Sequence, residues 1–124
     1  MNYTKYLGIP YKENGRDLNG LDCYGLVKVI DNDNSGTLPE YAIPSEESLA
    51  YQIYSDNKDL FEQIDKPEQG CIVVFSFKPG HIHVGTCIDN NRFIHILPKK
   101  NVCIERLDNF FWSKKIVGYY KWNK

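Results

Sequence analysis

The sequence predicts an α+β fold in which N-terminal helices pack on an antiparallel β-sheet. Three observations indicate it. Apolar residues recur at helical spacing in the first half of the chain, whereas the second half consists of short apolar segments separated by turn residues. The 124 residues, 42% of them hydrophobic and 14% aromatic, suffice for one compact core. The chain contains no internal repeat and no dividing linker, so we expect a single domain over residues 1–124.

One well-defined helix is expected after the first twenty residues. Asp22 is a favourable N-cap, and helical spacing then brings together on one face Cys23, Leu26, Val27 and Ile30. The turn-forming run 31–36 ends this helix. Ahead of it we expect a short helix over residues 2–7 and a loop over residues 11–20, where glycine and asparagine are frequent.

Two further elements are expected before the strands. A second helix is predicted to begin at Ser45, because Glu46 and Glu47 in its first turn favour the positive end of the helix dipole. Its apolar side comprises Leu49, Ile53 and Tyr54. Another short turn is predicted from Leu60, Phe61 and Ile64.

The second half of the chain predicts five strands. Its segments are rich in β-branched and aromatic residues and are bounded by turn-forming residues such as Asp89, Asn90 and Asn91. The expected strands cover residues 71–77, 82–88, 92–97, 101–107 and 115–122. Helices first and strands later are typical of an α+β domain with an antiparallel sheet.

Charge and hydropathy exclude several classes of function. Basic and acidic side chains nearly balance, 15 against 16, so bulk electrostatics offers no attraction for nucleic acid. No apolar run approaches the roughly 18 residues that a membrane-spanning helix needs. The start MNYTKYLGIPYKENG has neither an apolar core nor a small-residue cleavage site, so we expect no signal peptide and synthesis in the cytoplasm. An extracellular substrate would then be reached by a route other than general secretion.

One of the four cysteines differs from the rest in its position. Cys71, Cys87 and Cys103 lie in apolar stretches, and we expect them to be small buried hydrophobic residues. The cysteine spacing fits no zinc finger or ribbon. Cys23 falls in the first turn of the predicted helix, where the dipole favours the nucleophilic thiolate and backbone N–H groups could hold an oxyanion. From local pattern alone, a buried cysteine on an amphipathic helix remains the alternative.

The three histidines of the chain, His81, His83 and His95, lie in one predicted hairpin. His81 and His83 are two residues apart on a strand and therefore share a face. Whether His95 joins them depends on the loop between the strands. A two-residue loop over 90–91 would put His95 on the face opposite His83, whereas a three-residue loop over 89–91 would make the two diagonal neighbours.

Residue character favours the three-residue loop. This register gathers one clean apolar face, which comprises Ile82, Val84, Thr86, Ile88, Ile94 and Ile96. It also places Gly85 opposite His95, where a glycine leaves space for the imidazole to lean toward His83. We expect Asn91 to close this loop in the left-handed conformation, which asparagine tolerates.

Two histidines on one face suit a cysteine hydrolase. One imidazole takes the proton of a thiol, and a second polar group fixes its tautomer and orientation. Metal binding is a competing interpretation, because His-x-His on a strand is a common ligand arrangement. No Asp or Glu stands near His81 or His83 on the expected face to complete such a site, so we expect no metal there. On geometry alone, three structural histidines remain the alternative.

Three ordered motifs carry a resemblance to a known family. The run GLDCYGLV (20–27), preceded by GIPYKENGRD (8–17), resembles the nucleophile segment of the NlpC/P60 superfamily of papain-like cysteine peptidases. The run HVGTCIDNNRFIHI (83–96) is similar to the base segment of that superfamily, in which a second histidine lies twelve residues after the first. The run PEQGCIVVF (67–75) resembles the strand signature that precedes it, with Cys71 where an acidic residue is usual.

The resemblance spans most of the chain and implies roles for named residues. It implies a papain-like NlpC-type fold with the nucleophile, Cys23, at a helix start, His83 as its base and His95 as the orienting third residue. Tyr11 matches the tyrosine of the family's Pro-Tyr motif, and Asp22 matches the acidic residue that commonly precedes the cysteine. His81 matches no constant residue of the family and is expected in the wall of the active-site cleft. The implied mechanism needs neither a metal nor an organic cofactor.

The activity that the resemblance implies is hydrolysis of peptidoglycan stem peptides, at the amide between D-glutamate and the diamino acid. Three runs further resemble the peptidase domains of bacteriophage tail assembly proteins: GRDLNGLDCYGLV (15–27), LPEY (38–41) and VGYYKW (117–122). This branch implies a place in the virion or delivery to the host cell wall, with other tail proteins as partners. The alternatives are a structural tail component whose site is little used, and an NlpC-type amidase or acyltransferase with another substrate.

Overall fold

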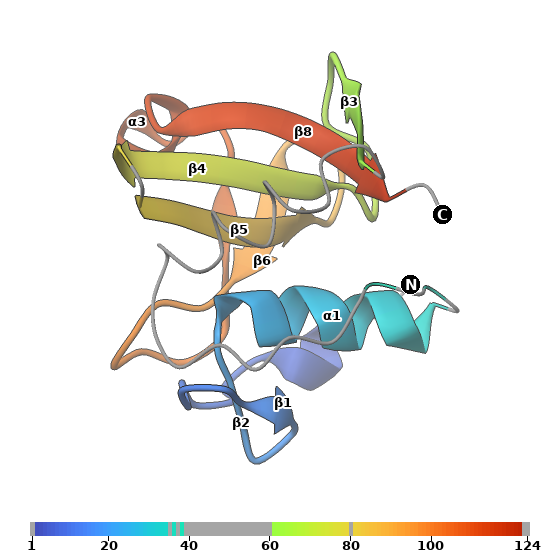
Figure 1. The fold of residues 1–124 in the computed structure, drawn as a ribbon, viewed down its shortest axis with the longest axis vertical. Helices are drawn as coiled ribbons and strands as arrows, with labels where there is room; N and C mark the ends of the chain where they lie inside the picture. Colours follow the sequence, from blue (N-terminus) through green and yellow to red (C-terminus); the bar gives the residue numbers. More distant parts are fainter. Residues whose placement is uncertain (1, 35, 37, 39–60, 80, 123–124) are drawn as a thin grey trace.

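The computed structural model describes residues 2–34, 36, 38, 61–79 and 81–122, and it has the predicted α+β architecture. One helix, α1 (Cys23–Asp33), packs on one face of a six-stranded antiparallel sheet. In Figure 1 the helix runs below strand β5, and a small two-stranded ladder lies below the helix. The helix predicted to begin at Ser45 falls outside the described residues. Within the described ranges, no helix is both long and apolar enough to cross a membrane.

The sheet contains all five predicted strands and one further strand. The five are β4 (Ile72–Lys78), β5 (His81–Cys87), β6 (Arg92–His95), β7 (Cys103–Arg106) and β8 (Ile116–Trp122). The sixth, β3 (Phe61–Ile64), pairs with β8 and begins the order β3-β8-β4-β5-β6-β7. The prediction of a turn at Phe61 and Ile64 is therefore wrong, because this segment satisfies the backbone N–H and C=O groups along the edge of β8.

The segment ahead of α1 is more regular than a simple loop. The predicted N-terminal helix is a single 3₁₀ turn, η1 (Thr4–Tyr6). Within the predicted loop, β1 (Arg16–Asp17) and β2 (Gly20–Leu21) form a small antiparallel ladder. The side chain of Asp17 accepts a hydrogen bond from the N–H of Asn19 at 2.9 Å, which closes the turn between them.

The helix α1 forms where the sequence predicts it. The side chain of Asp22 accepts a hydrogen bond from the N–H of Gly25 at 2.7 Å, as an N-cap does. The buried face of the helix packs on the sheet through Leu26, Val27 and Ile30. Opposite them lies the predicted apolar face of the hairpin, all six members of which are buried: Ile82, Val84, Thr86, Ile88, Ile94 and Ile96. Burial of each such side chain contributes about 1.5–3 kcal/mol, which fixes the helix against β5.

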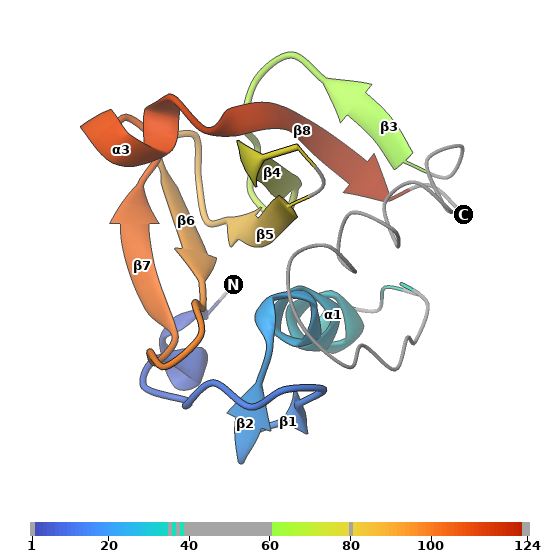
Figure 2. The same ribbon diagram turned by 60° about the vertical axis from the view of Figure 1, so that its left-hand side comes forward.

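A second buried cluster covers the other face of the sheet. We call four of its aromatic members the aromatic cluster: Phe75, Phe77, Phe93 and Trp112. Trp112 belongs to α3 (Phe110–Ser113), the short helix between β7 and β8, which Figure 2 shows at one end of the sheet. The side chain of Asn109 caps α3 and accepts a hydrogen bond from the N–H of Trp112 at 3.2 Å. The cap therefore positions the indole over this face.

The hairpin of β5 and β6 has the predicted three-residue register. Cys87 pairs with Phe93, and the N–H of Ile88 donates to the carbonyl of Arg92 at 2.9 Å. Two residues farther from the loop on each strand, the same register puts Gly85 opposite His95. The apolar side chains of the hairpin therefore lie on one face of the sheet and His83 and His95 on the other, as this register predicts.

Asp89, not Asn91, closes the hairpin loop. The carboxylate of Asp89 accepts hydrogen bonds from the N–H of Asn91 at 2.9 Å and from the N–H of Arg92 at 2.8 Å. Asn91 does not have a positive φ, so the predicted left-handed conformation is wrong. An aspartate that bonds to the backbone two residues later supplies the turn without that conformation.

Two of the three cysteines expected to be buried are buried. Cys71 is 2% and Cys87 is 0% exposed. The prediction for Cys103 is wrong, because its side chain is exposed. Cys103 belongs to β7, the last strand in the sheet order, and an edge strand keeps one side open to solvent.

Candidate active site

Cys23 is the first residue of α1 and is half-buried. It packs against an apolar cluster that includes Val27 of the same helix and Ile82 and Val84 of β5. The positive end of the helix dipole lies at this end of α1 and favours the thiolate form of a cysteine. Ile82 and Val84 flank His83 on β5, and strand alternation turns the side chain of His83 to the opposite face of the sheet, against Phe75 and Phe77.

Asp22 ties the loop before α1 to the first turn of the helix. Its side chain is almost fully buried. Besides the N–H of Gly25, its carboxylate accepts hydrogen bonds from the N–H of Asn14 at 3.0 Å and from the guanidinium of Arg16 at 2.8 Å. A buried carboxylate satisfied in this way fixes the backbone that carries Cys23.

Tyr11 and the following loop lie close to the start of α1. Tyr11 forms an isolated bridge with Leu21, two residues before the predicted nucleophile, and its N–H donates to the carbonyl of Lys100 at 3.0 Å. A Cβ on Gly25 would overlap with the carbonyl oxygen of Gly15. The helix therefore needs glycine at this position for the loop to cross it.

His83 and His95 meet on one face of the sheet. Nε2 of His83 lies 2.8 Å from Nδ1 of His95, and both side chains are 0% exposed. The two rings are enclosed by the aromatic cluster. Phe77 stacks on His83 with ring centroids 5.7 Å apart, and Trp112 meets His95 edge-to-face at 4.8 Å. This packing holds both imidazoles in fixed orientations.

Sequence reasoning missed two residues of this site, Glu105 and Trp112. Oε2 of Glu105 lies 2.7 Å from Nε2 of His95, and the indole N–H of Trp112 donates to Oε1 of Glu105 at 2.9 Å. In the β6–β7 pairing, His95 stands opposite Cys103, and Glu105 is the next residue on that face. Strand alternation predicts that Cys103 and Glu105 share a face, but nothing in the connection over residues 96–102 predicts the register in which β7 pairs with β6.

The hydrogen bonds that link Glu105, His95 and His83 determine which nitrogen of each imidazole carries the proton. A carboxylate only accepts, so His95 carries its proton on Nε2 and donates it to Glu105. Nδ1 of His95 is then an acceptor, and Nε2 of His83 donates to it. His83 is left with an unprotonated Nδ1, which is buried and has no hydrogen-bond partner within the described part of the chain. A basic nitrogen in this state can take up a proton.

Burial keeps both imidazoles neutral. It lowers the pKa of His83 well below its usual value, and the neighbouring His95 lowers it further. Burial also lowers the pKa of His95, although the hydrogen bond to Glu105 opposes this shift. Neutral rings agree with the proton assignment, since a protonated imidazole would donate from both nitrogens.

The thiol of Cys23 and Nδ1 of His83 are not hydrogen-bonded to each other in this structure. The two residues lie on α1 and β5, which pack directly on each other. Catalytic hydrogen bonds are often long without substrate and tighten in the complex. His81, the first residue of β5, is partly exposed and takes no part in the hydrogen bonds that join His83, His95 and Glu105.

Gly85→Ala is expected to disturb the histidine pair. A Cβ on this residue would lie 3.2 Å from the Cβ of His95 and 3.0 Å from the carbonyl oxygen of Ile94, so β6 would have to shift. We expect the free energy of unfolding to fall by about 1–3 kcal/mol, the usual cost of overpacking, and kcat to fall because His95 moves relative to His83. Chemical denaturation and steady-state kinetics measure the two effects. Wild-type kinetics in the folded variant would contradict the proposed need for glycine.

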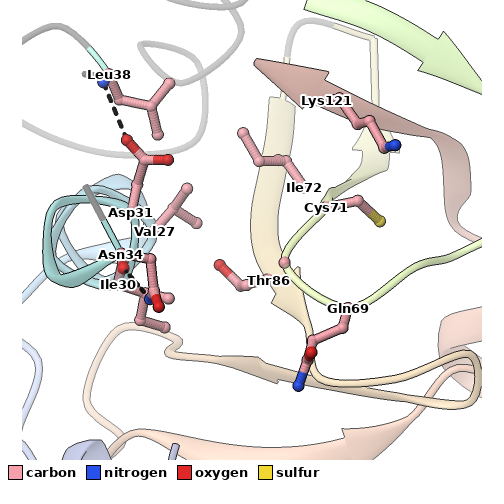
Figure 3. A pocket seen from close by; sticks show the side chains of 11 residues that line it. Val27, Ile30, Asp31, Asn34, Leu38, Gln69, Cys71, Ile72, Thr86 and Lys121 are labelled. Atoms are coloured by element: carbon pink, nitrogen blue, oxygen red, sulfur yellow. Dashed lines mark hydrogen bonds between the residues drawn. The ribbon is translucent and has the colours of Figure 1, made fainter. Parts of the chain in front are cut away.

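A separate cavity of about 280 Å³ lies between α1 and the sheet. Figure 3 shows Val27 and Asp31 of α1 on one side and Ile72 and Thr86 of the sheet on the other. Its described lining includes none of the residues predicted for the catalytic site. The cavity is therefore distinct from the histidine pair.

Among the described residues, the group of side chains that could hold a metal ion includes neither His81 nor His83. The donor atoms of His95, Cys103 and Glu105 all lie within 4.8 Å of one another. Sequence reasoning found no carboxylate beside His81 or His83, and the structure supplies one beside His95 instead.

Residues 8–121 match the model of the NlpC/P60 family. Over 111 residues the chain is 34% identical to the probable endopeptidase NlpC of Escherichia coli (strain K12). Over 113 residues it is 28% identical to the probable peptidoglycan endopeptidase LytE of Bacillus subtilis (strain 168). The matches cover 86% and 90% of this chain but 65% and 30% of those proteins, so the chain spans less than two thirds of the length of either.

Two solved structures share this fold. An NlpC/P60 family protein from Bacillus cereus ATCC 10987 superposes with a TM-score of 0.75 at 22% identity, over 98% of this chain and 38% of that one. The NlpC/p60 domain of the peptidoglycan hydrolase SagA superposes with a TM-score of 0.66 at 18% identity, over 95% and 91%. The predicted α+β fold is thus the fold of these domains.

Proposed function

The chain belongs to the NlpC/P60 family, and we propose on this basis that it is a cysteine endopeptidase of bacterial peptidoglycan stem peptides. Cys23 is the nucleophile, His83 is the base and His95 orients the base. Residues 1–124 act as a single peptidase domain. The names of two similar proteins, a probable endopeptidase and a probable peptidoglycan endopeptidase, support this substrate class.

The proposed reaction passes through an acyl-thioester. Cys23 gives its proton to Nδ1 of His83, and its sulfur attacks the carbonyl carbon of the amide. The N–H groups and dipole at the start of α1 stabilise the thiolate and the oxyanion that follows. His83 then protonates the departing amine, and a water deprotonated by His83 hydrolyses the thioester. His95 and Glu105 hold His83 in the tautomer that these steps require.

The hydrogen-bonded series Glu105–His95–His83 carries the proposal. It ends at a buried basic nitrogen that has no partner among the described residues. A buried polar atom without a partner costs about 1–3 kcal/mol, so a purely structural core would be more stable with apolar side chains here. A nitrogen that must accept a proton during each turnover accounts for this cost.

We propose that the amide between D-glutamate and the diamino acid is the bond cleaved. Mass spectrometry of the soluble fragments released from purified sacculi tests this choice. Fragments that end in D-glutamate are expected, and fragments cut elsewhere would reassign the bond. Turnover of a small amide or ester without any release from sacculi would instead favour the amidase or acyltransferase alternative.

We also propose that the protein acts from a bacteriophage tail. Support comes from the runs over residues 15–27 and 117–122, which resemble tail-associated peptidase domains. Mass spectrometry of purified virions is expected to detect the chain, and its absence from particles would contradict this placement. A structural tail component with a little-used site would be present in the particle but would release nothing from sacculi.

Hydrolysis is expected to survive treatment with EDTA. The mechanism uses a thiolate and an imidazole, and no step requires a Lewis acid. Rates measured before and after dialysis against the chelator check this. Loss of activity that added zinc restores would contradict the cysteine mechanism.

A further inference from the structure

His95, Cys103 and Glu105 converge at the solvent-facing edge of the histidine pair. Cys103 on β7 stands directly opposite His95 on β6. Its sulfur lies 3.9 Å from Oε2 of Glu105, and that oxygen lies 2.7 Å from Nε2 of His95. One thiol, one imidazole and one carboxylate from two neighbouring strands thus point at a common centre.

We propose that these three residues bind a zinc-type divalent ion, and that the bound ion inhibits the hydrolase. Sulfur and imidazole ligands suit zinc, whereas magnesium and calcium prefer oxygen ligands alone. Zinc lies about 2.0–2.3 Å from each such ligand, so the carboxylate of Glu105 must move outward to admit it. The side chain of Glu105 is 34% exposed, which leaves room for this movement.

The surroundings of the three ligands favour an ion that comes from solvent. Cys103 is exposed, so an ion reaches the site without crossing the buried aromatic cluster. A water molecule can occupy the fourth position of a tetrahedral site on this open side. The indole N–H of Trp112 holds the second oxygen of Glu105 at 2.9 Å and so orients the ligand from behind.

Zinc at this site would disable the proposed base through its tautomer, a consequence that rests on the proposed function. A neutral His95 that binds zinc through Nε2 carries its proton on Nδ1. This N–H faces Nε2 of His83, 2.8 Å away, so Nε2 must become the acceptor. The proton of His83 then resides on Nδ1, the atom that has to accept the proton of Cys23.

The protons balance in this exchange. Each imidazole keeps one proton, which moves from Nε2 to Nδ1. Cys103 binds as the thiolate and releases its proton to solvent. Removal of the ion by a chelator returns each proton to its former place, so the inhibition is reversible.

Cobalt(II) and zinc test the site by separate readouts. Cobalt bound to a thiolate gives a charge-transfer absorption band, which we expect in the wild type and in Cys23→Ala but not in Cys103→Ser. Cys23→Ala is the matched control, since it removes a cysteine outside the site. We also expect zinc to inhibit hydrolysis by the wild type. Measured against each protein's own zinc-free rate, the half-inhibiting zinc concentration should rise at least about tenfold in Cys103→Ser.

Any result of the cobalt and zinc experiments other than those expected would overturn a specific part of the proposal. A wild type without the cobalt band would overturn the site, and a band lost in Cys23→Ala but kept in Cys103→Ser would move the metal to the nucleophile. The expected bands without zinc inhibition would overturn the tautomer mechanism. If Cys103→Ser misfolds, Glu105→Ala removes a different ligand and should also weaken cobalt binding. Because the spectra need no turnover, cobalt bound at Cys103 in a protein that cleaves no peptidoglycan would refute the proposed function and leave the site intact.

Discussion

Replacement of Cys23 by alanine or serine is expected to abolish hydrolysis, with a loss of at least about 10⁴-fold in kcat/KM. Cys23 begins α1, where the dipole favours a thiolate, and it packs beside the strand that carries His83. Serine preserves the size of the side chain but is a weak nucleophile at neutral pH. Release of soluble fragments from purified sacculi measures the loss, and circular dichroism shows whether the variant is folded.

The other cysteines provide the matched controls for this substitution. Cys71→Ala and Cys87→Ala are expected to retain activity with reduced stability, because both side chains are buried. Cys103→Ala should retain both, since the residue is exposed and lies outside the proposed catalytic series. Iodoacetamide should label Cys23 before Cys71 or Cys87, and faster labelling of either buried thiol would contradict the assignment.

His83→Ala is expected to reduce kcat by about 10²–10⁴-fold, because it removes the proton acceptor. His95→Ala should leave a larger remainder, with a loss of about 10–100-fold, because it removes only the partner that orients the base. His95→Asn and His95→Gln should recover part of this loss, since an amide can also accept from Nε2 of His83. Steady-state kinetics on a soluble stem peptide gives the order of the variants.

His81→Ala is the matched control for the histidine series. It removes an imidazole two residues away on the same strand, and we expect a mild effect. The rate of alkylation of Cys23 adds an independent readout, because loss of the base should slow it in His83→Ala. Equal alkylation in His83→Ala and the wild type, or a greater loss of activity in His81→Ala, would require another base.

The histidine hairpin shows how far sequence alone can predict this site. Periodicity of two fixed which side chains share a face, and the apolar set selected one register out of two. The structure has that register, with Gly85 opposite His95 and the two rings in contact. The prediction succeeded because a slip of one residue would have turned a whole row of isoleucine and valine side chains away from α1.

The errors occurred where no periodic pattern constrains the chain. Asn91 is not left-handed because Asp89 closes the loop with its own carboxylate, a choice that composition leaves open. Phe61 and Ile64 lie in a strand because β8, far along the chain, offers an edge. Glu105 escaped notice because its meeting with His95 depends on the irregular connection between β6 and β7.

Trapping of the acyl-thioester tests most directly the central claim that Cys23 attacks the amide carbonyl. Wild-type protein is mixed with a soluble stem peptide, quenched in acid during the first turnovers, digested and analysed by mass spectrometry. We predict that the fragment containing Cys23 carries the mass of the acyl group, and that Cys23→Ala carries none and releases no amine. Turnover with the acyl mass on another residue, or turnover by Cys23→Ala at the wild-type rate, would contradict the claim.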